Sequence, residues 1–342
     1  MDFFPLHEVL GKLTSEPGTT DITFTSRGEV GVRQNMRMAV QTMEPVRLLW
    51  PGTVEHFFPN RPQDRRVGQT IMLVDGPRRY RATLTMEEGG EAIAIRPLPL
   101  RIRTAKELRL PEFLVPYVLG LKGGMFLIGG VTGSGKSSTL ASLVNAFREG
   151  AGGTVVTLEK PIEVLHAGNE KTIVHQREVG RDVVSYADGL HEAMHQNPDW
   201  IVVQEIRHPA EAETALAAAL SGHLVLASIH AFTAATTPQR YLSIINPTLE
   251  DVGARDALAS CLEGVLLQRL VEGYEGLVPV FEIMLMRNIE RRMERINAME
   301  NNLRLGNWVA LRQDTEAGKR LGMCLWQDSL QERIDAGLIP AQ

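Results

Sequence analysis

The stretch Gly130-Val-Thr-Gly-Ser-Gly-Lys-Ser137 decides the fold of this chain. It matches the pattern G-x-x-x-x-G-K-[ST] at every fixed position, and it stands between an apolar run over residues 125–128 and a helical pattern over residues 138–147. Glycines let the backbone N–H groups of such a loop converge on phosphate oxygens, and the following helix adds the positive end of its dipole. The motif and its flanks therefore predict a nucleoside-triphosphate site in an α/β fold.

Two residues of this loop have specific expected tasks. Lys136 is expected to reach the β- and γ-phosphates, and the Ser137 hydroxyl is expected to ligate Mg²⁺. The predicted nucleotide-binding residues of the loop are Gly130, Thr132, Gly133, Ser134, Gly135, Lys136, Ser137 and Ser138.

Carboxylates follow two further predicted strands. The apolar run at residues 200–203 leads to Glu205, which is expected near the metal ion or its water. Glu159 and Glu163 both follow the run at residues 154–158, close to the expected position of the phosphates. Hydrolysis requires a carboxylate that orients or deprotonates water, and the residues alone do not choose between these two glutamates.

The part of the chain after Pro111 alternates between two kinds of pattern. Continuous apolar runs cover residues 125–128, 154–158, 200–203 and 224–229. Helical patterns cover residues 137–148, 186–196 and 209–220. Continuous apolar runs are typical of strands buried on both faces, as in a parallel sheet with crossover helices. From about residue 245 onward we expect mainly helix, including one helix with the apolar positions Ile289, Met293, Ile296 and Leu303.

The first part of the chain has a different rhythm. A short amphipathic helix is expected where apolar residues recur at helical spacing, at Leu6, Val9, Leu10 and Leu13. Strands are expected at residues 21–25, 30–33, 70–74, 80–85 and 91–96. These patterns predict an antiparallel α+β domain over residues 1–99, a linker over residues 100–111 and a second domain over residues 112–342.

The composition of the chain excludes several classes of protein. The 342 residues are 44% hydrophobic and carry a formal net charge of -5, which fits a two-domain globular chain and argues against a protein that coats nucleic acid. Its 2 cysteines, Cys261 and Cys324, are too few and too far apart for a disulfide framework or a zinc ribbon. The N-terminus lacks a secretory pattern, and the longest apolar stretch is too short to span a bilayer. A cytoplasmic location is expected, with any membrane association peripheral.

A second motif has the spacing of a zinc-binding site. His191-Glu192-Ala-Met-His195 reads as H-E-x-x-H, which on a helix places two histidines on one face for zinc. Asn197-Pro198 ends that helix at once, and the third histidine of the longer zinc-protease motif is missing. The pattern is therefore interpreted as a coincidence of sequence.

Four boxes together resemble one family. They are GGVTGSGKSS (129–138), TLEKPIEVLH (157–166), NPDWIVVQEIR (197–207) and SGHLVLASIHAFTAATTPQR (221–240). In this order they are similar to the Walker A, acidic, Walker B and histidine boxes of the secretion-superfamily ATPases. That group includes pilus retraction motors, type II secretion and pilus-assembly ATPases, and conjugation and type IV secretion motors. LVPVFEIM (277–284) and GMCLWQDSLQERIDAGLI (322–339) most resemble the retraction-motor and Dot-type secretion branch.

The resemblance implies an architecture and ligands. It implies an N-terminal PAS-like domain followed by a RecA-like P-loop NTPase domain with a helical C-terminal part. It also implies a ring-shaped homohexamer that binds ATP and Mg²⁺ and docks on inner-membrane secretion or pilus platform proteins. Direct contact with nucleic acid is not expected.

The resemblance also assigns roles to particular residues. It makes Glu163 the catalytic carboxylate and Glu205 the Walker B residue near Mg²⁺, with Lys136 also counted among the catalytic groups. Glu159 is assigned to the nucleotide site, His230 senses the γ-phosphate, and His223 supports the site from the neighbouring strand. Arg81 and Arg96 match arginines that the family brings from the N-terminal domain to the nucleotide, where a guanidinium offsets developing negative charge.

Three departures from the family pattern stand out. Lys160 replaces the usual aspartate of the acidic box, and Gln204 replaces the glycine before the Walker B glutamate. His191 and His195 stand where the helix before Walker B usually carries two arginines.

The resulting hypothesis is an ATP-driven motor of a type IV secretion or conjugation system or of pilus retraction. The boxes do not distinguish among these machines. One alternative is a RecA-like motor stimulated by nucleic acid. Another, suggested by Lys160 and Gln204, is a ring subunit of the same machine that does not hydrolyse ATP.

Overall fold

The chain forms two compact units. The computed structural model describes residues 10, 13–14, 19–34, 37–58, 68–75, 78–246, 252–288 and 294–341. The two units are Met1–Arg101 and Ile102–Gln342. Each unit has its own hydrophobic core, as expected for an independently packed domain.

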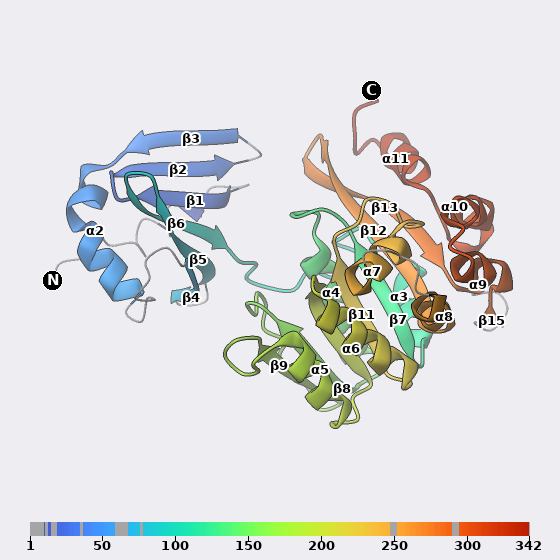
Figure 1. Cartoon of the computed structure of the whole chain (residues 1–342). Helices are drawn as coiled ribbons and strands as arrows, with labels where there is room; N and C mark the ends of the chain where they lie inside the picture. Colours follow the sequence, from blue (N-terminus) through green and yellow to red (C-terminus); the bar gives the residue numbers. More distant parts are fainter. Residues whose placement is uncertain are drawn as a thin grey trace. The chain divides into compact units, whose positions relative to one another are not determined.

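The first unit is built on a six-stranded sheet with the order β3-β2-β1-β6-β5-β4 (Figure 1). The strands are β1 (Thr19–Thr25), β2 (Glu29–Gln34), β3 (Arg37–Thr42), β4 (Gln69–Asp75), β5 (Arg78–Glu87) and β6 (Gly90–Pro97). All neighbours pair antiparallel, which confirms the predicted antiparallel sheet. Sequence analysis missed β3, because every residue of this edge strand is exposed and no apolar face marks it.

One helix packs on this sheet. Helix α2 (Glu44–Phe57) buries Val46, Trp50, Val54 and Phe57, and the same core contains Phe24 from β1 and Ile93 from β6. The spacing of the buried helix positions, four or three residues apart, is that of one helical face. The predicted amphipathic helix at the N-terminus falls largely outside the described residues, including its Leu6 and Val9 positions.

The second unit contains a seven-stranded sheet with the order β13-β12-β7-β11-β10-β8-β9 (Figure 1). Its strands are β7 (Gly124–Gly129), β8 (Gly153–Glu159), β9 (Thr172–Glu178), β10 (Trp200–Ile206), β11 (Leu224–Ile229), β12 (Leu262–Gly273) and β13 (Gly276–Leu285). All neighbours are parallel except β12 and β13. β7 and β11 are buried along their whole length, which confirms the prediction of a parallel sheet covered on both faces.

One helix, α3, precedes the first strand of this sheet, and further helices connect the parallel strands. They are α3 (Leu114–Gly120), α4 (Lys136–Glu149), α5 (Tyr186–Met194), α6 (Pro209–Leu220), α7 (Thr237–Ile245) and α8 (Val252–Cys261). The strand order with right-handed crossovers places α4 on one face of the sheet and α5, α6 and α8 on the other. Contacts agree, because α3 lies against α4, while α6 lies against α5, α7 and α8. The three helices and four strands predicted between residues 125 and 229 are confirmed.

The C-terminal part confirms the expected helices and corrects one of them. The helices α9 (Asn297–Arg304), α10 (Trp308–Ala317) and α11 (Trp326–Asp335) and the short η1 (Gly318–Leu321) are present, but the region expected to be mainly helical also contains the long hairpin β12–β13. The predicted helix through Ile289, Met293, Ile296 and Leu303 is wrong as drawn. A hairpin of β14 (Arg287–Asn288) and β15 (Glu294–Arg295) precedes α9, Ile296 caps that helix, and Ile289 and Met293 lie outside the described residues.

Sequence analysis also missed strand β9. Among the described strands it pairs with β8 alone and so lies at the sheet edge, where every residue after the buried Thr172 is partly or fully exposed. Its second half, His175, Gln176, Arg177 and Glu178, is polar and resembles a loop. Within the described ranges, no helix combines the length and apolar character needed to cross a membrane.

Candidate nucleotide site

Four parallel strands of the second unit end at one edge of the sheet. Gly129 at the end of β7 lies opposite Ile229 at the end of β11, and β10 runs in register with β8. The phosphate loop follows β7, the acidic box follows β8, Glu205 is near the end of β10, and His230 follows β11. Parallel pairing therefore brings together segments that are distant in the sequence.

The phosphate loop has the backbone that its glycines allow. Gly130, Gly133 and Gly135 have φ values of 151°, 78° and 92°, in the region that side chains rarely adopt. A Cβ on Gly130 would lie 2.4 Å from Ser134 Oγ and 2.5 Å from the Gln268 carbonyl oxygen. Gly135 directly precedes α4, so the first N–H groups of that helix face the loop.

Lys136 and Ser134 are the buried polar groups of the loop. The Lys136 ammonium donates to the carbonyls of Gly130 and Val131, both at 2.9 Å. Burial lowers the pKa of Lys136, and the nearby Glu205 carboxylate partly offsets this effect. Ser134 Oγ is buried and has no hydrogen-bond partner within the described residues. Both groups suit an anion at the loop, because an oxyanion would pair the ammonium and accept from the hydroxyl.

Glu205 and His230 meet at the ends of β10 and β11. Nε2 of His230 lies 2.7 Å from Glu205 Oε1, and Arg207 donates to Glu205 Oε2 at 2.5 Å. Thr132 of the phosphate loop lies 3.4 Å from the same Nε2. Burial lowers the pKa of His230, while Glu205 opposes this shift and Lys136 and Arg207 add to it. A pKa below the ordinary value keeps the imidazole largely neutral at pH 7. Glu205 Oε1 is buried and has no hydrogen-bond partner among the described residues, so Nε2 lies close to this oxygen without a formed hydrogen bond.

Glu159 is engaged inside the protein. Its carboxylate accepts from Thr157 Oγ1 at 2.7 Å and from Gln176 Nε2 at 3.0 Å. Burial raises the pKa of Glu159, although both hydrogen bonds favour the ionised form. The Glu159 carboxyl therefore bonds to side chains of its own strand, β8, and of the neighbouring strand, β9.

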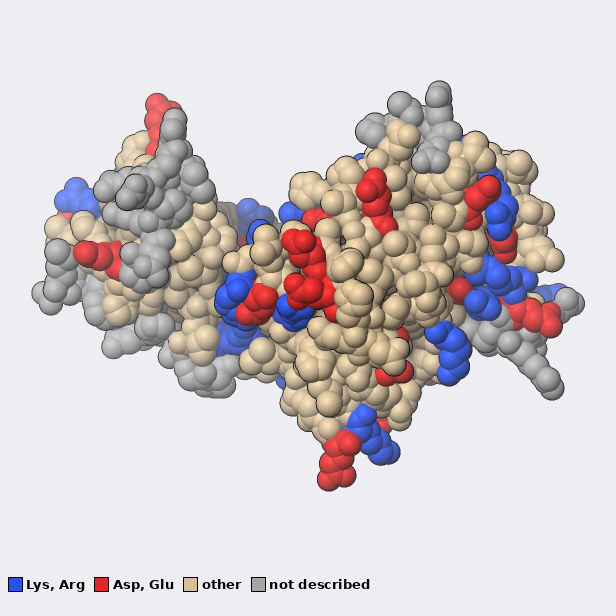
Figure 2. All heavy atoms as spheres, turned by 60° about the horizontal axis from the view of Figure 1, so that its bottom comes forward, with Lys and Arg blue, Asp and Glu red and all other residues tan. Residues whose placement is uncertain are grey.

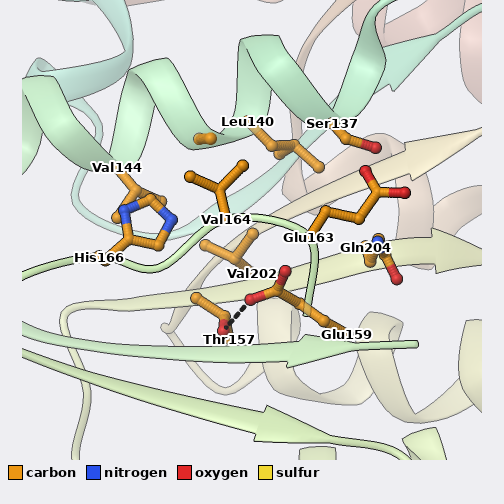
Figure 3. A pocket seen from close by; sticks show the side chains of 11 residues that line it. Ser137, Leu140, Val144, Thr157, Glu159, Glu163, Val164, His166, Val202 and Gln204 are labelled. Atoms are coloured by element: carbon orange, nitrogen blue, oxygen red, sulfur yellow. Dashed lines mark hydrogen bonds between the residues drawn. The ribbon is translucent and has the colours of Figure 1, made fainter. Parts of the chain in front are cut away.

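A pocket lies between α4, the acidic box and the ends of β8 and β10. Figure 3 shows the Glu163 carboxylate directed to the end of the pocket where Ser137 and Gln204 lie. The opposite end is closed by Val144 and His166. Glu163 thus shares a cavity with the hydroxyl of the phosphate loop.

Three residues of the C-terminal hairpin support the site, and sequence analysis missed them. Thr139 of α4 donates to Gln268 on β12 at 2.6 Å, and Arg269 donates to the Phe232 carbonyl at 2.5 Å. The Glu282 carboxylate on β13 accepts from the Ala234 backbone N–H at 2.7 Å. Polar residues inside the apolar stretches VLLQRLV (265–271) and VFEIML (280–285) were the available signal, because buried polar groups need partners.

Three predicted residues belong to other parts of the chain. His223 precedes β11 and bonds with Ser221 at 3.0 Å, so it lies at the edge of the sheet opposite His230. Arg81 and Arg96 belong to the first unit, where they face each other across β5 and β6. Arg96 also pairs with Asp21 at 2.7 Å.

The histidine pair of the H-E-x-x-H motif has ordinary surroundings. The rings of His191 and His195 stack edge to face with centroids 4.9 Å apart, and Glu192 pairs with Arg177 at 2.5 Å. Over the described residues, no three His, Cys, Asp or Glu side chains are grouped so as to hold a metal.

Comparison with known proteins places this site in a family. The family described as "Type II/IV secretion system protein" matches residues 59–275. The chain is 34% identical over 260 residues to the uncharacterized protein YggR of Escherichia coli, covering 76% of each chain. It is 32% identical over 257 residues to the type IV pilus retraction ATPase PilT of Pseudomonas aeruginosa, covering 74% of this chain and 72% of PilT.

A solved structure agrees with these sequence matches. The crystal structure of the pilus retraction motor PilT with bound ADP aligns with a TM-score of 0.80 and 29% identity, over 98% of this chain and 94% of that one. The family match over residues 59–275 includes the phosphate loop, Glu163, Glu205 and His230. The structural match covers 98% of the chain. The chain belongs to the type II/IV secretion system protein family.

Proposed function

We propose that this chain is an ATPase motor that works as a homohexamer and powers pilus retraction or a type II/IV secretion system. The observation that carries the proposal is the meeting of Lys136, Glu205 and His230 at the edge of the sheet where the phosphate loop lies. The similarity to PilT supports the kind of machine.

The residues present fit a nucleoside triphosphate. The positive-φ glycines expose the loop amides, Lys136 supplies a cation, and Ser134 Oγ, buried without a partner among the described residues, is ready to donate. Ser137 and Glu205 would hold Mg²⁺, which when bound neutralises charge on the phosphate oxygens. Lys136 and the loop amides would bind and orient the phosphates.

The acidic side chains would divide the remaining work. Glu163 shares the pocket with Ser137 and would accept a proton from the attacking water. His230 lies beside Glu205, with Nε2 2.7 Å from Oε1, and would sense the γ-phosphate from there as a largely neutral imidazole. Arg81 and Arg96 would approach the nucleotide from the first unit within the hexamer, where their charge would stabilise the transition state. Closure of the subunits around ATP would be the step that performs work.

Location and partners follow from this proposal. The hexamer would dock on the inner-membrane platform of the machine, so that its membrane association is peripheral and depends on protein partners.

Two substitutions test the proposal. Lys136→Ala is expected to abolish nucleotide binding by calorimetry, because the loop loses its cation. Glu163→Gln is expected to bind ATP with unchanged affinity while turnover falls by about a thousandfold. Glu170→Gln, an exposed carboxylate before β9, serves as the control. Normal turnover by Lys136→Ala would refute the site, and rapid turnover by Glu163→Gln would move the catalytic role to another carboxylate.

The two alternative functions predict different ATPase and binding results for the same purified protein. A motor stimulated by nucleic acid should turn over faster with DNA or RNA and bind it in a salt-dependent way. Figure 2 instead shows Lys and Arg scattered among Asp and Glu on one face of the molecule. A non-hydrolysing subunit should release no phosphate in a single-turnover experiment with Mg²⁺. Lys160, which suggested that alternative, has an exposed side chain.

A further inference from the structure

The turn that carries Glu163 is held by side chains from three strands. The Lys160 backbone N–H donates to Gln204 Oε1 on β10 at 2.5 Å, and the Ile162 N–H lies 3.4 Å from Glu178 Oε2 on β9. The Glu159 carboxylate on β8 receives a backbone hydrogen bond from Glu163. Pro161 has no N–H, so every backbone donor between residues 160 and 163 has a side-chain acceptor.

Gln204 differs from Glu178 and Glu159 because its side chain both accepts a hydrogen bond from the turn and donates one to it. Its Oε1 accepts from Lys160, and its Nε2 donates to the Pro161 carbonyl at 3.2 Å. Only a side chain with a donor and an acceptor at its tip can make both bonds, and glutamine supplies them at the required length. A carboxylate would lose the second bond, and an apolar side chain would lose both.

The position of Gln204 makes its two hydrogen bonds to the turn relevant to hydrolysis. It directly precedes Glu205 on β10, and it lines the same pocket as Glu163 and Ser137 (Figure 3). Its amide therefore ties the turn that carries Glu163 to the strand that carries Glu205. The carboxylates of Glu163 and Glu205 belong to segments from neighbouring strands. None of the interactions described above joins these two carboxylates to each other.

We propose that Gln204 is a positioning residue for ATP hydrolysis. It holds the turn at residues 160–163 against β10, and so keeps the Glu163 carboxylate at the Ser137 end of the pocket. Its effect is on the geometry of the hydrolytic step and not on nucleotide affinity, because the phosphate loop and Lys136 have no hydrogen bond to its side chain among the described contacts. The proposal rests on the proposed function, in which Glu163 activates water.

The test compares Gln204→Met with the wild-type full-length protein. Methionine keeps the length and volume of the side chain and removes both hydrogen bonds. We expect kcat to fall by about ten- to a hundredfold, with KM and the dissociation constant for ATP within about twofold of wild type. Hydrogen exchange at the amides of Lys160, Ile162 and Glu163 should accelerate by about tenfold, while the amides of the phosphate loop stay unchanged. Exposed Gln196→Met is the matched control, and its kinetics and exchange should equal those of wild type.

The outcomes separate this proposal from the proposed function. Unchanged exchange in the turn, or faster exchange with unchanged kcat, would overturn the role of Gln204. An equal loss of ATP affinity and kcat would also overturn it, because the residue would then act on binding. Rapid turnover by Glu163→Gln would instead defeat the assignment of the catalytic carboxylate, and hydrogen exchange in Gln204→Met would still report whether the side chain of Gln204 holds the turn.

Discussion

Nε2 of His230 lies 2.7 Å from Oε1 of Glu205, so the residues that end two adjacent parallel strands touch directly. Burial lowers the pKa of His230, so this contact is not an ion pair near pH 7. Glu205 Oε1 has no hydrogen-bond partner among the described residues, so a small rotation of the imidazole or the arrival of a ligand can change this contact.

Removal of the imidazole should slow turnover with little effect on binding. We expect His230→Ala to lower kcat by about a hundredfold, because the imidazole that lies between Glu205 and Thr132 of the phosphate loop is lost. The ratio of wild-type to variant kcat should stay constant between pH 7 and pH 8, since the imidazole is already neutral there. Steady-state ATPase assays across that range check both statements. An unchanged kcat, or a ratio that climbs with pH, would contradict them.

Two glycines of the phosphate loop offer a matched pair. Gly133→Ala meets no atom within 4 Å and suffers only its positive φ, which costs about 1–2 kcal/mol. Gly130→Ala has positive φ as well, and its Cβ would also clash with the Gln268 carbonyl and Ser134 Oγ. We expect Gly130→Ala to weaken ATP binding at least about tenfold more than Gly133→Ala. Calorimetric titration of both variants measures the difference, and equal affinities would show that the close approach is unimportant.

His166 should make the second unit sensitive to acid. Burial, with a contribution from Arg148, lowers its pKa from 6.5 to about 4. Between these values the unfolded chain binds more protons than the folded one, so stability falls as the pH drops. The loss should be about 2 kcal/mol between pH 7.5 and pH 5, and His166→Leu should not show it. Thermal unfolding at both pH values tests this, with exposed His175→Leu as the control. Equal acid sensitivity of His166→Leu and wild type would refute the effect.

Arg81 should act in turnover. It lies opposite Arg96 across β5 and β6, and two guanidinium groups on neighbouring strands suit a bound anion. We expect Arg81→Ala to lower kcat of the full-length protein by about a hundredfold. Arg33→Ala, an exposed arginine of β2 in the same unit, is the comparison. A variant that hydrolyses ATP at the wild-type rate would exclude Arg81 from the reaction.

The elements next to the phosphate loop were predictable because their signals are local. A strand buried on both faces leaves a continuous apolar run, and β7, β8, β10 and β11 all show one. β3 and β9 were missed because edge strands face solvent, and polar residues there resemble a loop. The hairpin β12–β13 was missed because Gln268 and Glu282 interrupt its apolar pattern, although both are buried and bonded.

The sequence by itself determined the chemistry of this protein. Glycine spacing, one lysine and the hydroxyl that follows it specify a phosphate loop, because local backbone freedom and charge suffice to define it. Only the tertiary structure decided which side chains complete the site. It placed His230 on Glu205, put His223 at the opposite edge of the sheet, and showed Gln204 bonded to the turn before Glu163. These contacts depend on strand order and register, which bring distant residues together and leave no local signal in the chain.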